Sequence, residues 1–448
     1  MTSDASPTVV WFRDDLRLAD NPALTAAAAR GPVVALFVLD EESPGIRPLG
    51  GAARWWLHHS LASLQARLAA HGVPLVLRRG AAGAVVREIA ASLGAGAVMW
   101  NRRYASAERA VDTELKSGLR AAEIEVQSFA ASLLFEPWTV QTGSGTHYSV
   151  FTPFWRACQS LPAPRQPLPE PENLHGGSAL PSDELSEWNL LPTSPDWAAG
   201  LRETWEPGEP AGLARLHQFV SGDLADYDRA RDEPSAGATS MLSPRLRWGE
   251  ISPFTAWHAA VDAGESARFL TELGWREFAW HTLFHFPNLA TKNLRPEFDA
   301  FPWPDVDDGA LAAWRKGNTG FGIVDAGMRE LWHTGHMHNR VRMITASFLI
   351  KNLMIDWRIG EQWFWDTLVD ADAASNPFSW QWVAGSGADA APYFRIFNPE
   401  LQAKKFDPHG VYVQQWAADA SPLQIVDLGL TRKAALAAYD VVKRSGRP

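Results

Sequence analysis

DADAASNPFSWQWVAGSGADAAPYFRIFNP, residues 370–399, is the stretch around which the rest of the chain is interpreted. It combines carboxylates, an asparagine, a Trp-Gln-Trp motif, a run of small residues and an aromatic-Arg-aromatic run. Its apolar residues do not follow a helical period, so an ordinary core helix is not predicted here. Because a residue before proline is biased away from helical angles, Asn376-Pro377 predicts a loop at the start of the stretch.

Composition indicates a soluble globular protein of two or three domains, with 448 residues, 46% apolar and 21% charged. No run reaches the roughly 20 apolar residues of a membrane span. The first residues, MTSDASPTVVWF, lack the basic region and apolar core of a signal peptide. The single cysteine, Cys158, excludes an internal disulfide and a four-cysteine iron–sulfur cluster. We therefore expect a cytoplasmic protein that does not enter a membrane.

The charge balance argues against a nonspecific nucleic-acid binder, because 41 basic and 51 acidic residues give a net charge of −10. A local basic patch on an acidic protein could still bind DNA. The 22 tryptophans allow two interpretations, since indole rings pack well in cores and also stack on bases or carry oxidising holes. Composition alone leaves both interpretations open.

The first 130 residues alternate short apolar runs with alanine-rich helical stretches such as 52–70 and 107–122. The strands are predicted at 8–12, 33–39, 74–77, 97–100 and 125–129. Alternation of this kind predicts a parallel, doubly wound sheet. No GxGxxG follows the first strand, and GSGADA at 385–390 follows no strand, so a nicotinamide-binding domain is not expected.

Residues 161–210 are rich in proline and predict a connecting segment, and from about residue 213 onward helical patterns dominate. The predicted fold is an N-terminal Rossmann-like parallel α/β domain followed by an all-helical domain. The predicted limits are 1–135 for the α/β domain, 136–212 for the connector and 213–448 for the helical domain.

The motif TSMLSP, residues 239–244, offers hydroxyl groups at the start of a predicted helix. Ser243 as N-cap with Pro244 at the first helical position is a strong helix start. A helix N-terminus with nearby hydroxyls can hold a phosphate. On local sequence alone, an ordinary helix cap is the favoured interpretation of the motif.

Two further motifs place polar and aromatic side chains on one helical face. They are Glu272, Trp275 and Arg276 in TELGWREF, and Asn339, Arg342 and Met343 in MHNRVRM. The spacing i, i+3, i+4 brings each set together, although an ordinary amphipathic helix has the same spacing. Asp370 is a candidate partner for Arg342. The nearby histidines at 333, 336 and 338 lack a cysteine or a fixed partner, so no metal site is predicted.

With these motifs and the opening WFRDDLRLADNPAL at 11–24, the chain resembles the DNA photolyase/cryptochrome family from residue 11 to about 407. The sequences of these motifs most resemble those of the bacterial, class III-type photolyases that act on cyclobutane pyrimidine dimers. The resemblance implies light-driven repair of these dimers, in which excited, fully reduced FAD donates an electron to a lesion flipped out of the duplex. It also implies UV-damaged DNA as partner, a monomer, and no metal.

The resemblance assigns the site residue by residue. Catalytic roles fall on Glu272, Asn339, Met343 and Asn376. FAD binding falls on Tyr227, Thr239, Ser240, Met241, Leu242, Ser243, Glu272, Arg276, His336, Asn339, Arg342, Asp370, Asp372 and Asn376. Met241 stands where the family commonly has a basic residue, and His336 where dimer-repairing relatives usually have tryptophan.

The remaining assignments concern DNA, electron transfer and an antenna. Trp275 and Trp382 are expected to stack on the lesion, and Arg231, Arg340 and Arg395 to contact the DNA phosphates. Trp380, Trp357 and Trp303, in order from the flavin outward, match an electron-transfer chain, although each tryptophan taken singly also fits a core position. The antenna is expected to be 5,10-methenyltetrahydrofolate, contacted by Glu108 and Lys292.

Three alternatives stay open. A cryptochrome would keep the flavin site and the tryptophan chain without needing Trp275, Trp382 or Met343. A (6-4) photolyase would carry a pair of histidines around the positions of Asn339 and Met343, which disfavours it here. A flavin electron-transfer protein without a light function is the weakest, because nothing resembles a pyridine-nucleotide site.

Overall fold

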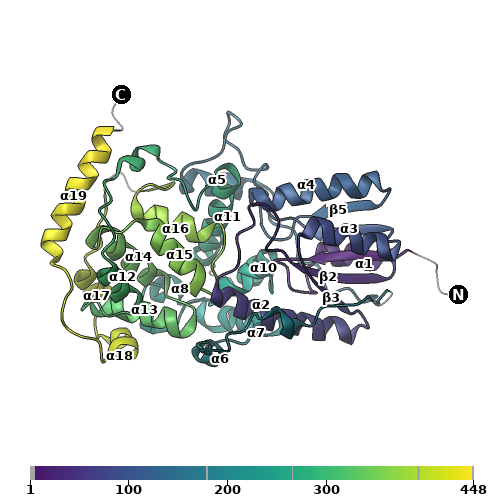
Figure 1. Ribbon diagram of the computed structural model, residues 1–448, viewed down its shortest axis with the longest axis horizontal. Coiled ribbons are helices and arrows are strands. Elements are labelled where there is room, and N and C mark those ends of the chain that lie inside the picture. The colour runs from purple at the N-terminus through teal and green to yellow at the C-terminus, as the bar shows by residue number, and fades with distance from the viewer. Residues whose placement is uncertain (1–5, 178–179, 265, 391–393, 446–448) are drawn as a thin grey trace.

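The computed structural model describes residues 6–177, 180–264, 266–390 and 394–445. An α/β unit and a helical unit lie side by side along the long axis of the molecule (Figure 1). The α/β unit contains the N-terminal strands, and the helical unit carries the C-terminal helix. The predicted fold class, a parallel α/β domain followed by an all-helical domain, is confirmed. The exact domain limits stay a prediction.

The sheet has five parallel strands in the order β3-β2-β1-β4-β5. Their bounds are β1 (Thr8–Phe12), β2 (Val33–Leu39), β3 (Leu75–Arg79), β4 (Ala97–Asn101) and β5 (Glu125–Phe129). The central strands β1 and β2 are buried along their whole length, because helices cover the sheet on both faces. All five strands lie where the sequence predicts them. β3 ends two residues later than predicted, and β4 ends one residue later.

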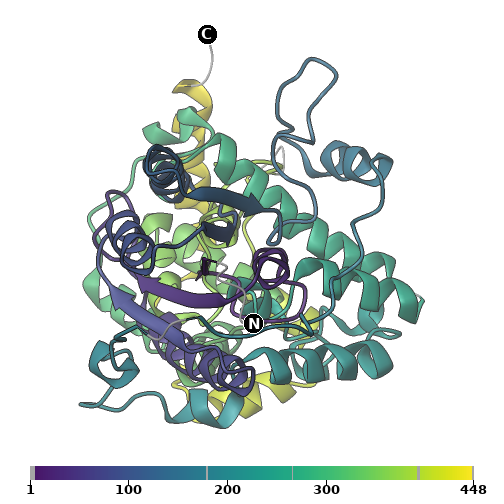
Figure 2. The same cartoon turned by 90° about the vertical axis from the view of Figure 1, so that its right-hand side faces the viewer.

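Helices cover both faces of the sheet, and the side chains of each strand alternate between them. Val10 packs into a core with α1 (Pro22–Arg30) and α2 (Gly51–Ala70). Val9, its neighbour, packs into a separate core with α3 (Ala82–Leu93) and α4 (Ser106–Ala121). In Figure 2 this three-layered unit faces the viewer and the helical unit lies behind it.

The rest of the described chain is helical or irregular. Its elements are α5 (Phe151–Ser160), η1 (Leu185–Trp188), α6 (Ala199–Thr204), α7 (Glu209–Gln218), η2 (Phe219–Asp223), α8 (Tyr227–Ala230), η3 (Pro234–Ala236), α9 (Ser243–Arg247), α10 (Pro253–Ala263), α11 (Ala267–His285), η4 (Pro296–Ala300), α12 (Asp308–Arg315), α13 (Gly322–Thr334), α14 (Asn339–Ser347), η5 (Phe348–Asn352), α15 (Trp357–Thr367), α16 (Ser375–Ala384), α17 (Pro399–Phe406), α18 (Val411–Ala417) and α19 (Leu428–Ser445). None of the helices in the described residues is long and apolar enough to cross a membrane.

Two local predictions are wrong. The stretch does begin with irregular residues at 370–374, but Asn376 and Pro377 lie inside α16, a buried helix that the sequence did not predict. Pro377 is tolerated because the first N–H groups of a helix have no intrahelical partner, and α16 lacks a period because it is buried nearly all round. Ser243 is the first residue of α9, and Leu242 is its N-cap. The Ser243 hydroxyl does not cap the helix because it donates to Asp370 instead (2.6 Å).

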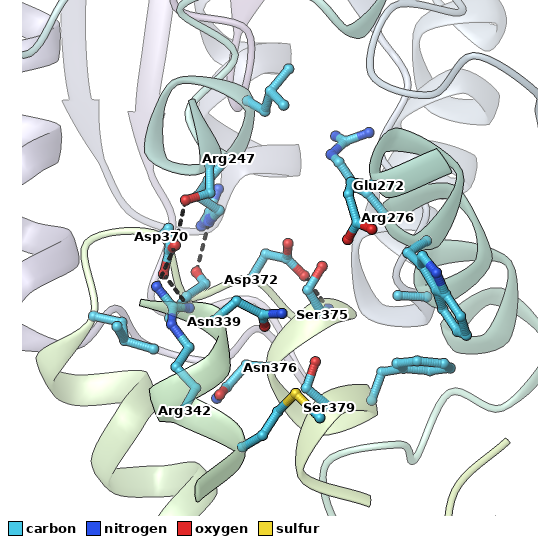
Figure 3. A pocket seen from close by; sticks show the side chains of 18 of the residues that line it. Arg247, Glu272, Arg276, Asn339, Arg342, Asp370, Asp372, Ser375, Asn376 and Ser379 are labelled. Atoms are coloured by element: carbon cyan, nitrogen blue, oxygen red, sulfur yellow. Dashed lines mark hydrogen bonds and ion pairs between the residues drawn. The ribbon is translucent and has the colours of Figure 1, made fainter. Parts of the chain in front are cut away.

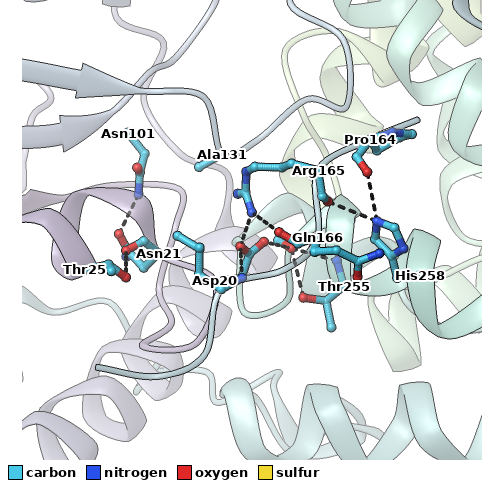
Figure 4. Close-up of polar contacts among 12 residues, drawn as sticks. Asp20, Asn21, Thr25, Asn101, Ala131, Pro164, Arg165, Gln166, Thr255 and His258 are labelled. Carbon is cyan, nitrogen blue, oxygen red and sulfur yellow. Dashed lines mark hydrogen bonds and ion pairs between the residues drawn. The ribbon is translucent and has the colours of Figure 1, made fainter. Parts of the chain in front are cut away.

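The connector is held between the two units by a buried carboxylate of the α/β unit, Asp20 (Figure 4). One carboxylate oxygen accepts from Arg165 of the connector (2.5 Å), and the other accepts from the Ser252 hydroxyl at the start of α10. From α10, the His258 ring nitrogen reaches the carbonyl oxygens of Pro164 and Arg165, each at 3.0 Å. The connector is therefore fixed to both units by charged and polar contacts.

The end of the α/β unit is fixed to α11 by the side chains of Glu277 and His281. The N–H of Phe135 donates to Glu277 (3.1 Å), and the Phe135 carbonyl contacts the His281 ring nitrogen (3.0 Å). Burial raises the pKa of Glu277 to about 7, against the attraction of Arg276, and burial lowers the pKa of His281 to about 4.

Replacing Glu277 by glutamine is expected to stabilise the protein progressively, relative to wild type, as the pH rises from about 4.5 to 7. In this window the unfolded wild-type chain has released the Glu277 proton and the folded chain still binds it, so wild-type stability falls with pH. The gain should reach about 2–4 kcal/mol. Urea denaturation of both proteins across the pH range checks it, and His281 contributes equally to both. A constant difference would show that Glu277 has an ordinary pKa.

Candidate active site

A cavity of about 520 Å³ opens between α8, α9, α11, α14 and α16 (Figure 3). Most residues assigned to the site from the sequence line it. They are Tyr227, Arg231, Ser240, Leu242, Ser243, Glu272, Trp275, Arg276, Asn339, Arg340, Arg342, Met343, Asp370, Asp372, Asn376, Trp380 and Trp382. Residues separated by more than 150 positions in the sequence therefore share one chamber.

An ion pair forms one wall of the cavity. Both guanidinium Nη atoms of Arg342 donate to the Asp370 carboxylate, at 3.1 and 2.8 Å, and Nε donates to the Met337 carbonyl (2.7 Å). Asp370 accepts a third hydrogen bond, from Ser243. Burial acts to raise the pKa of Asp370, but Arg342 and Ser243 outweigh it and hold the pKa below its ordinary value. The predicted pairing of Asp370 with Arg342 is confirmed.

Asn376 is oriented by a carboxylate that also binds the α/β unit. Its Nδ2 donates to the carbonyl (3.1 Å) and the side chain (2.9 Å) of Glu361. Glu361 in turn accepts two hydrogen bonds from Arg47 (2.7 and 2.9 Å). With Nδ2 engaged, the amide oxygen of Asn376 is the group that can accept a hydrogen bond from a bound molecule.

Two of the three arginines predicted to contact phosphates, Arg231 and Arg340, line the cavity and hold carboxylates. Arg231 forms an ion pair with Glu272 of α11. Arg340 donates to Asp232 (2.8 Å). The guanidinium of the third, Arg395, lies over the Trp382 ring at 5.9 Å. These carboxylates keep the cations in place in the absence of an anionic ligand.

The three tryptophans of the predicted chain lie in one apolar core at different depths. Trp380 lines the cavity and packs edge-to-face on Phe364 (4.9 Å between ring centroids). Trp357 is fully buried, and its Nε1 donates to Asn293 (3.0 Å). Trp303 is partly buried at the margin of this core.

Three predicted flavin contacts do not line this cavity. Thr239 and Met241 are not among its lining residues, and the carbonyls of Thr239 and Ser240 accept from Arg215 at 2.8 and 2.9 Å. Met241 has a left-handed backbone (φ 54°) and packs against the core of the α/β unit. His336 lies behind the cavity wall, 3.7 Å from Glu330.

Three residues that sequence reasoning did not single out also shape the site. Arg215 braces the 239–243 loop, and Arg247 lines the cavity while donating to the Ala371 carbonyl (2.9 Å) and to Asp14 (2.7 Å). Glu361 orients Asn376. No local motif marks these side chains, because each acts on a partner distant in the sequence. Within the described ranges, no group of three histidine, cysteine or carboxylate side chains could hold a metal ion.

A second cavity, of about 320 Å³, lies between the α/β and helical units. Glu108 lines it, 3.5 Å from Arg103, and burial raises the Glu108 pKa. Lys292 does not line it; the Lys292 carbonyl accepts from Gln381 (2.9 Å). The indole N–H groups of Trp11 and Trp280, which line this cavity, have no hydrogen-bond partner among the described residues. Both indole rings border the cavity, and their N–H atoms are buried.

Comparison with known proteins finds two family models. One, described as DNA photolyase, matches residues 8–172, and the other, described as the FAD binding domain of DNA photolyase, matches residues 269–439. The chain is 48% identical to deoxyribodipyrimidine photo-lyase of Agrobacterium fabrum, covering 99% of this chain and 100% of that protein. It is 38% identical to cryptochrome-1 of Arabidopsis thaliana, covering 93% of this chain and 63% of that protein.

Among solved structures, the chain is similar to a bacterial class III photolyase from Agrobacterium tumefaciens. The TM-score is 0.94 and the sequence identity 48%, with 99% of each chain covered. A match of this extent includes both units.

Proposed function

This chain belongs to the DNA photolyase/cryptochrome family, and we propose on this premise that it is a deoxyribodipyrimidine photo-lyase, which uses light to repair cyclobutane pyrimidine dimers in DNA. The observation that carries the proposal is the 48% identity over the whole chain to an enzyme of that name. The cavity supports it, because flavin-site and lesion-site residues line the same chamber.

The larger cavity fits FAD by its chemistry. Its volume lies within the usual range for cofactor sites, and it combines apolar walls with a few fixed polar groups. When bound, reduced and excited by light, FAD supplies an electron that splits the cyclobutane ring and then returns. The Arg342–Asp370 pair is a preorganised charge on one wall, suited to the polar edge of a flavin. With its Nδ2 held by Glu361, Asn376 would accept a flavin N–H through its amide oxygen.

The lesion would occupy the part of the cavity lined by Trp275, Trp382 and Met343. Two indole rings offer stacking faces to the flipped pyrimidines, and Glu272 offers a carboxylate for their N–H groups. Arg231 and Arg340 would exchange their carboxylate partners for DNA phosphates. This local basic surface allows an acidic protein to bind DNA. The protein would act as a monomer in the cytoplasm.

A flavin photoreceptor of the cryptochrome type is the second candidate, because the chain is 38% identical to a plant cryptochrome. Such a protein needs the flavin wall but no lesion-stacking surface. Trp275, Trp382 and Met343 on the same cavity favour repair. The (6-4) photolyase alternative is disfavoured by Asn339 and Met343, which take the place of the expected histidines.

Reduced, FAD-loaded protein is expected to split thymine dimers in DNA under blue light and not in the dark. Replacing Trp275 by alanine should weaken dark binding of dimer-containing duplex by about 1–3 kcal/mol, the usual worth of one base–aromatic stack. Filter binding measures the affinity, and loss of dimers measures repair. Trp332→Ala, which removes an exposed indole away from the cavity, is the matched control and should change neither. Equal binding of damaged and undamaged DNA, with no repair, would favour the photoreceptor.

The tryptophan chain is expected to carry electrons to oxidised FAD from an external donor. Trp380→Phe keeps an aromatic ring beside Phe364 and should cost on the order of 1 kcal/mol of stability. We expect unchanged flavin content, greatly slowed photoreduction, and normal repair by chemically reduced protein. Trp303→Phe should give a weaker defect. Trp188→Phe, a buried indole of the connector that packs into the core of the α/β unit, controls for packing loss. If the Trp380→Phe protein is photoreduced at the wild-type rate, Trp380 only packs in the core and is not part of the electron-transfer chain.

The second cavity is proposed to hold 5,10-methenyltetrahydrofolate as an antenna. A folate carries carboxylates, which Arg47 and Arg103 in the lining of this cavity can bind. Glu108, with its raised pKa, can meet the pterin N–H groups. When bound, the folate would absorb light and pass the energy to the flavin. Lys292 is not supported as a direct contact by its position.

Glu108→Gln is expected to lower folate binding at least several-fold and leave flavin content unchanged, because Glu108 lines only the second cavity. Glu114→Gln on the same helix is the control, since its side chain is exposed. Near-ultraviolet absorbance of protein mixed with the folate and passed through a desalting column measures uptake. Protein that takes up no folate contradicts the antenna assignment.

A further inference from the structure

A ring stack on Trp275 is the strongest contact at the cavity to which no role has yet been assigned. Phe151, the first residue of α5, lies parallel to the Trp275 ring at 9°, with 3.7 Å between ring centroids. Phe151 is 7% exposed and does not line the cavity, whereas Trp275 does. One face of the Trp275 indole is therefore covered by protein, and the opposite face is the one available to a ligand.

The stack continues away from the cavity and is closely packed. On α5, Trp155 lies parallel to Phe151 at 12°, one helical turn along (6.3 Å). Trp155 reaches α11 because residue 274 is glycine, where a Cβ atom would lie 2.6 Å from the Trp155 ring. Phe278 meets Phe151 and Trp275 edge-on, at 6.0 and 6.1 Å. These rings leave Phe151 little freedom to move.

The loop just before Phe151 is also tied to the segment that follows α16. The Asp389 N–H donates to the carbonyl of Ser149, two residues before Phe151 (3.2 Å). Since α16 carries Trp382, the start of α5 is connected to both tryptophans of the cavity, to Trp275 by stacking and to Trp382 along the chain.

We propose that Phe151 is a positioning residue for lesion recognition, which fixes the Trp275 indole in the orientation that receives a flipped-out pyrimidine dimer. This inference rests on the proposed repair function. An indole has two side-chain torsions, and holding them before binding removes an ordering cost that the ligand would otherwise bear. The benefit falls on dimer-containing DNA, because phosphate contacts to undamaged DNA do not involve Trp275.

The test compares Phe151→Leu with wild type in the FAD-loaded protein, in the dark and at fixed salt. We expect dimer-containing duplex to bind about 3- to 10-fold more weakly, the effect of losing one aromatic pair, and undamaged duplex to bind unchanged. Phe151→Tyr, which keeps the ring, should restore dimer binding to within about 2-fold of wild type. The affinity ratio is the readout, because a general loss of stability would lower both affinities together.

A double-mutant cycle with Trp275 isolates the positioning role. In a Trp275→Ala background, Phe151→Leu should have no further effect on dimer binding, since the ring it orients is gone. Phe154→Leu on the same helix is the matched control; Phe154 packs on Phe278 and His281 and should leave the affinity ratio unchanged.

Three results would overturn the inference. They are an unchanged affinity ratio in Phe151→Leu, the same loss in Phe154→Leu, and a full Phe151→Leu effect without Trp275. A Trp275→Ala protein that binds dimers as well as wild type is a different failure. It would remove the lesion platform of the proposed function, and this inference with it.

Discussion

The ion pair between Arg342 and Asp370 is the interaction on which the cavity depends. It joins α14 to the segment before α16, and the Ser243 hydroxyl adds α9 to the same carboxylate. Removing one partner of a buried pair usually costs about 3–5 kcal/mol, because the other charge is left without compensation. Arg342 keeps 24% of its side chain exposed toward the cavity, so a bound molecule can meet a charge that is already fixed. The wall is therefore both a structural junction and a preorganised site.

The two cavities share part of one wall. Charged residues at and near this wall also hold the two units together. Arg247 and Asp372 line both cavities, and Arg247 forms an ion pair with Asp14 of the α/β unit. Glu250 supplies a second junction, because its buried carboxylate accepts from Trp56 of α2 and from Arg245 of α9. A chromophore in one cavity would lie close to a flavin in the other, at a separation fixed by buried charges.

Much of the fold could be predicted from the sequence because local patterns determine it. The apolar run of Val33–Leu39 predicts a buried strand without help from other residues, and helical spacing alone brings Glu272 next to Trp275 and Arg276. Contacts between distant residues that no motif or resemblance marks could not be predicted. Asn376 is helical because tertiary burial outweighs the bias imposed by Pro377. Phe151 meets Trp275 across more than 100 residues, and no motif marks such a pair.

The central claim is that one chamber receives both the flavin and the flipped-out lesion. A crystal structure of the FAD-loaded protein with a duplex carrying a thymine dimer tests it most directly. The dimer is predicted to lie outside the duplex stack, in van der Waals contact with the flavin and flanked by Trp275 and Trp382, with the flavin against the Arg342–Asp370 wall. A dimer that remains stacked in the duplex, or binds away from this cavity, would contradict the account.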